Sequence, residues 1–299
     1  MQILYGAFTT FIDVTDICLL KLIQNNVITI PSGDINRTNY FTDPLYGVLK
    51  KIIIIINNVE TQYNIFTEIK INIKDNTITI KKTNKDINYT IGHLHSKLKI
   101  NHGSLNDELP EQKMTVMYLT GNEKVLEIGG NIGRNSLIIS SILQESANLV
   151  TLESDVNIAK QLQENRELNN FKFHIENSAL SNRKLIQKGW DSEPSNILLE
   201  GYSWVNTITL DELKAKYNIE FDTLVLDCEG AFYYILMDMP EILNNINLII
   251  MENDYHDISR KNYVDNILIQ NNFIVSYTKS GGWGCCYHNF FEVWTKLSI

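Results

Sequence analysis

The sequence has few cysteines and prolines and no long apolar run. Its four cysteines, Cys18, Cys228, Cys285 and Cys286, include no C-x-x-C pair and no zinc-type spacing. The usual cysteine pattern of a zinc site is therefore excluded, and reduced thiols are the expectation. The longest conspicuous apolar run, residues 52–56, is far shorter than the roughly 20 residues that span a bilayer. The first residues also lack the basic-then-apolar form of a secretory signal. We expect a cytoplasmic protein with no membrane partner.

Positive charge is also scarce. The chain has 26 Lys and Arg against 35 Asp and Glu, which gives a net charge of −9. Binding along a nucleic-acid backbone needs clustered basic side chains, so we expect no nucleic-acid partner. A small basic pocket is not excluded by this balance.

A length of 299 residues allows one large domain or two moderate ones. Residues 1–91 predict a small β-rich accessory domain, with strands at 27–30 and 50–57 and a hairpin at 70–74 and 77–81. A short helix at 16–24, capped by Thr15, is also expected. Nothing in this part has a catalytic pattern, although a homo-oligomer could form through it. Residues 92–109 read as a linker, and residues 110–299 as the main domain.

The linker contains an H-x-H pair, His93 and His95. On a strand, the two imidazoles would lie on one face and could bind a metal. No acid is near them in the sequence, so a surface position is the preferred interpretation.

From residue 125 onward, strand and helix patterns alternate, as in βαβ units. The sequence predicts a Rossmann-like α/β fold with a mainly parallel sheet of seven strands. We expect the strands at residues 125–128, 149–152, 171–175, 223–227, 248–251, 273–277 and 290–295. We expect helices at residues 110–119, 135–143, 156–168, 210–217, 232–238 and 262–271.

The first predicted strand runs into a glycine-rich turn before a helix, which is typical of a cofactor site. The turn has the pattern E-x-G-x-N-x-G, formed by Glu127, Gly129, Asn131 and Gly133, with Gly130 between them. A dinucleotide fold prefers G-x-G-x-x-G, and its pyrophosphate would be repelled by an acid such as Glu127. An ammonium group would be attracted to that acid. The pattern therefore favours a cofactor with a cationic amino-acid end, such as S-adenosylmethionine.

Residues after the next two strands support an adenosine cofactor. Glu153 follows the second strand and could accept hydrogen bonds from both ribose hydroxyls, although a dinucleotide enzyme would show the same acid. Ser178 and Ala179 follow the third strand, where small residues would let an adenine ring lie flat.

Acidic residues follow the fourth and fifth strands. Asp227 and Glu229 come after the fourth strand, and Glu252 with Asn253 after the fifth. Carboxylates at the end of an apolar strand are costly unless they are solvated, paired or used. We interpret Asp227, Glu229 and Glu252 as catalytic, and hard oxygen ligands there would suit Mg²⁺. Alternatively, Glu252 and Asn253 hold loops or substrate hydroxyls directly.

The surroundings of these acids argue against some enzyme classes. The chain lacks the Asn/Asp-Pro-Pro-aromatic sequence of many amino-directed methyltransferases, and Cys228 is interpreted as a packing residue rather than a nucleophile. Near the end of the chain, Trp283 or Tyr287 in a glycine-rich loop could stack on a sugar, or the loop could be a plain hairpin connection.

Three segments together resemble the FkbM family of S-adenosylmethionine-dependent methyltransferases. They are the glycine turn 127–133, the T-x-T-L-D-x-L segment 207–213, and residues 222–231 with the pattern D-x-E-G-A. The resemblance covers roughly residues 111–295. It implies a class I methyltransferase sheet, with the last strand inserted antiparallel, and an O-methyltransferase acting on hydroxyls of sugars or polyketide-like metabolites. Glu127, Gly130 and Phe232 depart from the family's usual residues, and Phe232 stands where a second acid often follows.

The leading hypothesis is therefore methyl transfer from S-adenosylmethionine to a hydroxyl of a sugar, glycan or related small metabolite. A catalytically inactive module with the same fold is the alternative, and a nucleic-acid methyltransferase or a nicotinamide dehydrogenase is less favoured. The Ile- and Asn-rich composition and two-part layout also resemble proteins of giant DNA viruses, in which case the location would be the host cytoplasm.

Overall fold

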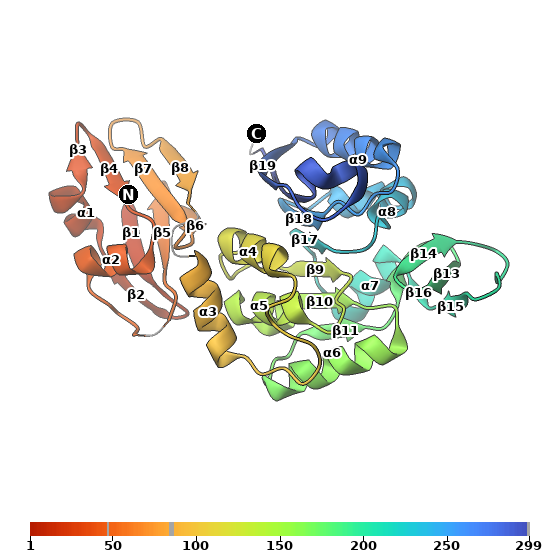
Figure 1. The fold of residues 1–299 in the computed structure, drawn as a ribbon. Coiled ribbons are helices and arrows are strands. Elements are labelled where there is room, and N and C mark those ends of the chain that lie inside the picture. The colour runs from red at the N-terminus through yellow and green to blue at the C-terminus, as the bar shows by residue number, and fades with distance from the viewer. Residues whose placement is uncertain (47, 84–86, 298–299) are drawn as a thin grey trace. The chain divides into compact units, whose positions relative to one another are not determined.

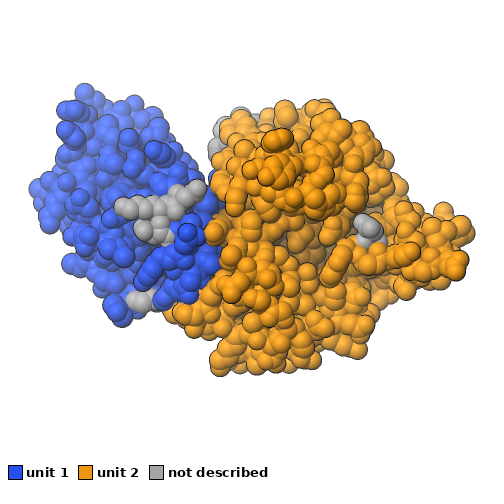
Figure 2. All heavy atoms as spheres, in the orientation of Figure 1, with its two compact units in different colours: residues 1–93, 116–121 blue, residues 94–115, 122–299 orange. Residues whose placement is uncertain are grey.

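The computed structural model describes residues 1–46, 48–83 and 87–297. Residues 47 and 84–86 of the predicted accessory domain, and residues 298–299 of the predicted main domain, lie outside the described residues. The chain divides into two compact units (Figure 2). Unit 1 comprises Met1–His93 and Val116–Gly121, and unit 2 comprises Leu94–Thr115 and Asn122–Ile299.

Unit 1 contains two four-stranded sheets in which neighbouring strands are antiparallel (Figure 1). The first has the order β2-β1-β5-β6 and the second the order β3-β4-β7-β8. The strands are β1 (Gln2–Ala7), β2 (Thr10–Asp13), β3 (Ile23–Gln24), β4 (Val27–Ile30), β5 (Lys51–Ile56), β6 (Val59–Tyr63), β7 (Thr67–Asn72) and β8 (Ile78–Lys82).

Isoleucines from both sheets form the core of unit 1. Ile52 and Ile54 of β5 lie in one buried cluster with Ile69 and Ile71 of β7. The two sheets therefore share a single core. Two short helices, α1 (Thr15–Lys21) and α2 (Asp34–Phe41), add Cys18 and Phe41 to it.

The prediction that Thr15 caps α1 is wrong. The N-cap is Val14, and no side chain caps the helix. Thr15 instead accepts a hydrogen bond from the backbone N–H of Ile3 and donates one to Asp13. Its hydroxyl therefore joins the helix start to β1 rather than to the first turn of the helix.

The predicted linker region contains a helix. Helix α3 (Ile87–Lys97) includes both His93 and His95, so the strand arrangement that would have put both imidazoles on one face does not occur. Residues two apart on a helix do not share a face. His95 forms a hydrogen bond of 2.7 Å with Gln112 of α4 (Leu109–Tyr118).

No helix in residues 1–46, 48–83 and 87–297 is long and apolar enough to cross a membrane.

Unit 2 is built on a seven-stranded sheet with the order β11-β10-β9-β17-β18-β20-β19. All neighbours are parallel except β20, which pairs antiparallel with both β18 and β19. The predicted mainly parallel sheet, with its last strand inserted antiparallel, is confirmed. The strands are β9 (Val125–Ile128), β10 (Leu149–Leu152), β11 (His174–Glu176), β17 (Thr223–Leu226), β18 (Leu248–Glu252), β19 (Phe273–Lys279) and β20 (Phe291–Lys296).

Helices flank this sheet. Every residue of the central strands β9, β10 and β17 is buried, as expected of a parallel sheet covered on both faces. The longer helices are α5 (Arg134–Ile142), α6 (Val156–Leu168), α7 (Leu210–Tyr217), α8 (Phe232–Asp238) and α9 (Ile258–Gln270), and short 3₁₀ turns lie at η1 (Ser146–Asn148), η2 (Pro240–Leu243) and η3 (Gly284–Asn289).

A small β insertion follows β11 and was not predicted. Strands β13, β14 and β15 form a three-stranded antiparallel sheet that projects from the rest of unit 2 (Figure 1). Two short parallel strands, β12 and β16, join it to the main fold. The bounds are β12 (Ala179–Leu180), β13 (Leu185–Lys188), β14 (Asp191–Pro194), β15 (Ser203–Val205) and β16 (Thr207–Ile208).

Candidate functional site

A cavity of about 300 Å³ lies at the carboxyl ends of the parallel strands. Its lining includes Gly129 after β9, Glu153 after β10, Asp227 after β17 and Glu252 at the end of β18. Ligands of open α/β sheets collect at this edge because the loops after adjacent strands converge there. Of the residues proposed from the sequence, those that line the cavity are Gly129, Asn131, Glu153, Ser178, Ala179, Asp227, Glu229 and Glu252.

The glycines of the turn are required by protein packing as well as by backbone conformation. Gly129 has a φ of +92°, and a Cβ there would lie 1.6 Å from the backbone oxygen of Asp227. A Cβ on Gly130 would lie 2.2 Å from Oγ1 of Thr151, and one on Gly133 would lie 2.4 Å from a methyl group of Leu162. Gly130 and Gly133 do not line the cavity of about 300 Å³. These two glycines therefore serve the contact of the turn with β10 and α6.

Glu127 lies behind the turn. It is 2% exposed, is not part of the lining of the 300 Å³ cavity, and accepts a hydrogen bond from the Ser136 hydroxyl in the first turn of α5. It lines a much smaller adjacent cavity that also touches Gly129 and Asp227. Burial raises the pKa of Glu127 to about 7, although the hydrogen bond from Ser136 lowers it. The structure thus places this acid against a helix start rather than in the open cavity.

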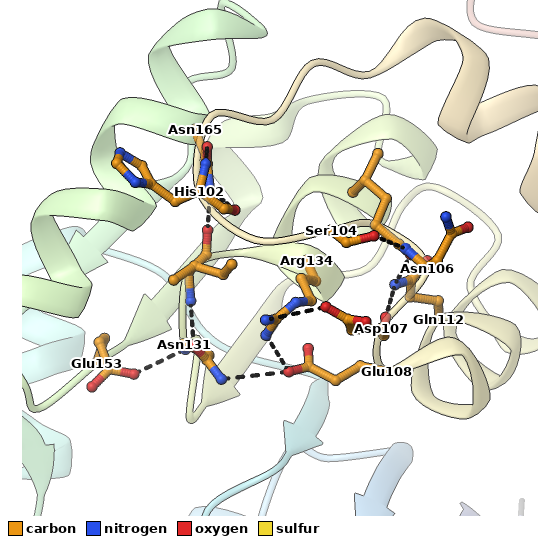
Figure 3. Close-up of polar contacts among 12 residues, drawn as sticks. His102, Ser104, Asn106, Asp107, Glu108, Gln112, Asn131, Arg134, Glu153 and Asn165 are labelled. Atoms are coloured by element: carbon orange, nitrogen blue, oxygen red, sulfur yellow. Dashed lines mark hydrogen bonds and ion pairs between the residues drawn. The ribbon is translucent and has the colours of Figure 1, made fainter.

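Glu153 connects the second strand to the glycine turn (Figure 3). One carboxylate oxygen accepts a hydrogen bond of 2.9 Å from the backbone N–H of Asn131, and the other accepts one of 2.8 Å from the N–H of Asp155. Burial raises the pKa of Glu153, whereas these two hydrogen bonds lower it. A carboxylate has about four lone-pair sites. Glu153 therefore keeps capacity for ligand hydroxyls.

A loop before α4 supplies an acid that the sequence did not indicate. Glu108 lines the cavity and pairs with Arg134, the first residue of α5 (Figure 3). Asn165 of α6 holds this loop by hydrogen bonds to the backbone of His102, and it also donates to the backbone oxygen of Ile132. Such contacts between distant segments leave no local pattern. Glu108 could not be found from spacing alone.

Ser178 and Ala179 lie at the cavity wall, but their polar groups already have partners. The Ser178 hydroxyl donates to Glu176, and the N–H of Ala179 donates to the backbone oxygen of Asn206. The side chain of Asn177 donates to the backbone oxygens of Glu153 and Ser154. This segment therefore offers a fixed, small-residue surface to a flat ligand.

The other end of the cavity is acidic. Asp227, Glu252 and Asp254 place carboxylate oxygens within 4.8 Å of one another. Burial raises the pKa of Asp227 well above its ordinary value, and the neighbouring carboxylates, Asp254 first, add to the shift. Burial likewise raises the pKa of Asp254 to about 7, with Glu229 and Glu111 contributing. Like charges held close together in a partly dry site produce these shifts.

Asp254, rather than Asn253, joins this cluster. Asn253 is fully buried, and its amide donates to the backbone oxygen of Asn289 and to Glu292. Glu292 is also paired with Lys261, whose side chain is 1% exposed. The alternative in which Asn253 holds a loop is therefore confirmed. The order of acid and amide after a strand does not reveal which side chain turns toward the sheet edge.

Aromatic side chains at the cavity come from the unpredicted insertion and from α8. Trp190, which is 58% exposed, and Tyr234 line it. Trp283 and Tyr287 do not line it, so of the two interpretations of their loop the structure favours a plain connection over stacking in this cavity. The Trp283 ring instead lies 4.5 Å from that of His256. Trp190 precedes a polar strand with no hydrophobic alternation, which is why the sequence did not single it out.

Two further sequence features have structural explanations. Thr209 is the N-cap of α7 and forms a capping box with Glu212, so the T-x-T-L-D-x-L segment marks a helix start away from the cavity lining. Cys228 lines the cavity, but burial raises the pKa of its thiol. The prediction that it is not a nucleophile agrees with this shift, because the thiolate is the reactive form.

Comparisons with known proteins find similarity at the level of structure. No protein-family model matches the chain, and no curated protein sequence matches it. An O-methyltransferase from Bacillus cereus, solved in complex with SAH, is 16% identical, with a TM-score of 0.42 over 71% of this chain and 90% of that one. A ribosomal protein L11 methylase from Lactobacillus delbrueckii subsp. bulgaricus is 10% identical, with a TM-score of 0.41 over 67% and 82%. An rRNA methylase from Streptococcus thermophilus is 10% identical, with a TM-score of 0.39 over 62% and 94%. At these values the similarity carries no conclusion about chemistry.

Proposed function

We propose that this chain is an S-adenosylmethionine-dependent O-methyltransferase that acts on a hydroxyl of a sugar, glycan or related small metabolite. One observation carries the proposal. A single cavity joins the glycine turn and Glu153 at one end to a group of carboxylates at the other. A cofactor and an acceptor could therefore meet inside it.

The residues present fit the proposed cofactor. Glu153 lies beside the turn at the end of β10, where it can accept hydrogen bonds from two neighbouring ribose hydroxyls. Apolar side chains of Leu180, Ile235 and Met239 line the same cavity and can cover an adenine ring. Glu127 lies behind the turn and can add negative potential there once it is ionised, at a pH above its raised pKa of about 7.

The acidic end fits a hydroxyl acceptor. Asp227, Glu229 and Glu252 line the cavity as hydrogen-bond acceptors, and the aromatic side chain of Trp190 lines the same cavity. Aromatic rings pack well against the C–H face of a sugar, while acids bind its hydroxyls. This combination supports a carbohydrate-like acceptor over a nucleic acid, in agreement with the net charge of −9.

When bound, the cofactor would supply a methyl group on a sulfonium, and transfer to oxygen is an in-line displacement. The chain's contribution is to hold the acceptor oxygen in line and to exclude water. Asp227 or Glu229, which both line the cavity, can accept the hydroxyl proton as the new C–O bond forms and the C–S bond breaks. A carboxylate held beside the acceptor oxygen suits this role for a weakly acidic hydroxyl.

Binding and turnover can be tested separately. We expect S-adenosylhomocysteine to bind the full chain in the micromolar range by isothermal titration calorimetry, and NAD to give no thermal shift. Asp227→Ala should keep this affinity within about threefold but lower methyl transfer to a sugar panel at least about 100-fold, the range of one acid–base group. Glu145→Gln, an exposed change on another loop, is the matched control for surface charge.

The outcomes distinguish the alternatives. Absence of S-adenosylhomocysteine binding would leave the fold as an inactive module. If S-adenosylhomocysteine binds and the chain methylates RNA but no sugar, the acceptor is a nucleic acid rather than a carbohydrate. Full activity of Asp227→Ala would remove Asp227 from the mechanism.

A further inference from the structure

The three carboxylates Asp227, Glu252 and Asp254 come from the ends of two adjacent parallel strands. Each offers an oxygen, and these oxygens lie within 4.8 Å of one another. Across residues 1–46, 48–83 and 87–297, no ion pair involves any of the three. Three acids are thus gathered without a basic side chain in contact.

The orientation of Asp254 is an independent sign of a ligand. Asp254 is 5% exposed, and its Oδ2 finds no hydrogen-bond partner among the described residues. Glu111, which is 7% exposed, has an Oε2 that also finds no hydrogen-bond partner among the described residues. It interacts electrostatically with Asp254. Burying a carboxylate oxygen without a partner is costly in the folded state. A bound cation would remove that cost.

The surroundings hold this oxygen in place. The neighbouring Asn253 is fixed by its bonds to Asn289 and Glu292, so the backbone on the N-terminal side of Asp254 is anchored. A hydrogen bond from the backbone of Glu229 also reaches the Asp254 carboxylate. The surrounding protein therefore holds the Asp254 carboxylate in place, although the neighbouring carboxylates repel it.

We propose that Asp227, Glu252 and Asp254 bind one divalent cation, Mg²⁺ or Mn²⁺. The donor set consists of carboxylate oxygens, which hard cations prefer, and the open cavity leaves positions for water or substrate oxygen. The site deepens the proposed function, and its catalytic role rests on that function. The cation would lie where the acceptor hydroxyl is bound. Asp227 would then be a ligand, and Glu229 the carboxylate left to accept the proton.

Cation binding can be measured without catalysis. The full chain, stripped with EDTA, is titrated with MnCl₂ and followed by electron paramagnetic resonance and by calorimetry. We expect one Mn²⁺ per chain, displaced by excess Mg²⁺. Asp254→Asn and Glu252→Gln keep the side-chain shape and should each weaken Mn²⁺ binding at least tenfold. Glu145→Gln should bind as the unmodified chain does.

Thermal unfolding separates loss of a ligand from loss of the fold. Without metal, Asp254→Asn should unfold at the same or a higher temperature, because a repelling charge is removed. Mn²⁺ should raise the unfolding temperature of the unmodified chain but not that of the variant.

Two results would overturn the proposal. One is no Mn²⁺ binding at millimolar concentration, and the other is Mn²⁺ binding by Asp254→Asn and Glu252→Gln that is as tight as binding by the unmodified chain. Titration with S-adenosylhomocysteine in EDTA keeps this failure distinct from failure of the proposed function. If S-adenosylhomocysteine binds but Mn²⁺ does not, only the proposed cation site is wrong. If Mn²⁺ binds but S-adenosylhomocysteine does not, only the proposed methyltransferase function is wrong.

Discussion

At the scale of single residues, Glu127 shows that the position of an acid in a strand does not fix the direction of its side chain. The sequence placed this acid two residues before the first glycine, and β9 does end there. Its side chain is nevertheless turned to Ser136 and excluded from water. Whether a strand residue faces a cavity or a helix depends on which helix packs above it, and one sequence does not give that.

The burial of Glu127 predicts a pH dependence of stability. Its folded-state pKa is about 7 against an ordinary 4.5, and burial is the main cause, with Glu108 and Glu153 adding to it. The folded state therefore holds this proton more tightly than the unfolded state. The resulting stability is fully present below pH 4.5 and is lost as the pH rises through 7. The loss is roughly 3 kcal/mol at 1.36 kcal/mol per pKa unit.

Urea unfolding at pH 5 and pH 8 measures this effect. Glu127→Gln cannot titrate, so its stability should fall less between the two pH values than that of the unmodified chain. Parallel pH profiles for the two proteins would mean that Glu127 is ionised in the folded state.

At the scale of elements, helix α7 explains the most distinctive segment of the sequence. Thr209 accepts a hydrogen bond from the N–H of Glu212, and Glu212 accepts one from the N–H of Thr209. These bonds satisfy two donors that a helix start leaves free. The segment is therefore needed for a helix boundary, and its resemblance to a family pattern reports on the fold more than on the chemistry.

Loss of this cap should destabilise the chain. Thr209→Ala removes the hydroxyl acceptor and should lower the free energy of unfolding by about 1 kcal/mol. Thr207→Ala is the matched control, because Thr207 is exposed and lies before the helix. Chemical denaturation of both variants checks the difference, and an equal loss in the two would assign the effect to strand propensity instead.

At the scale of the whole molecule, the sequence predicted the sheet of unit 2 better than the site. All seven strands were located because β9, β10, β17 and β18 are continuous apolar runs between helix patterns. The insertion was missed because its strands are short and without alternation. Glu108 and Trp190 were missed because they reach the cavity through tertiary contacts. Asp254 was missed because tertiary contacts also place it beside Asp227 and Glu252.

Every residue that lines the 300 Å³ cavity belongs to unit 2. Hydrogen exchange with and without S-adenosylhomocysteine should therefore show protection in peptides covering residues 128–133, 152–154 and 178–181. Peptides from the core of unit 1, such as β5 and β7, should exchange at unchanged rates. Protection confined to unit 1 would place the cofactor elsewhere.

The antiparallel strand β20 sets an order of events during synthesis. It lies between β18 and β19 in the sheet, and its Glu292 anchors the loop that carries Asp254. A ribosome completes the glycine turn and Glu153 more than 130 residues before it reaches Glu292. The emerging chain thus has the glycine turn and Glu153 of its proposed cofactor end long before its acidic end can be fixed. Until β20 is inserted, a nascent chain could hold a methyl donor without an ordered place for an acceptor.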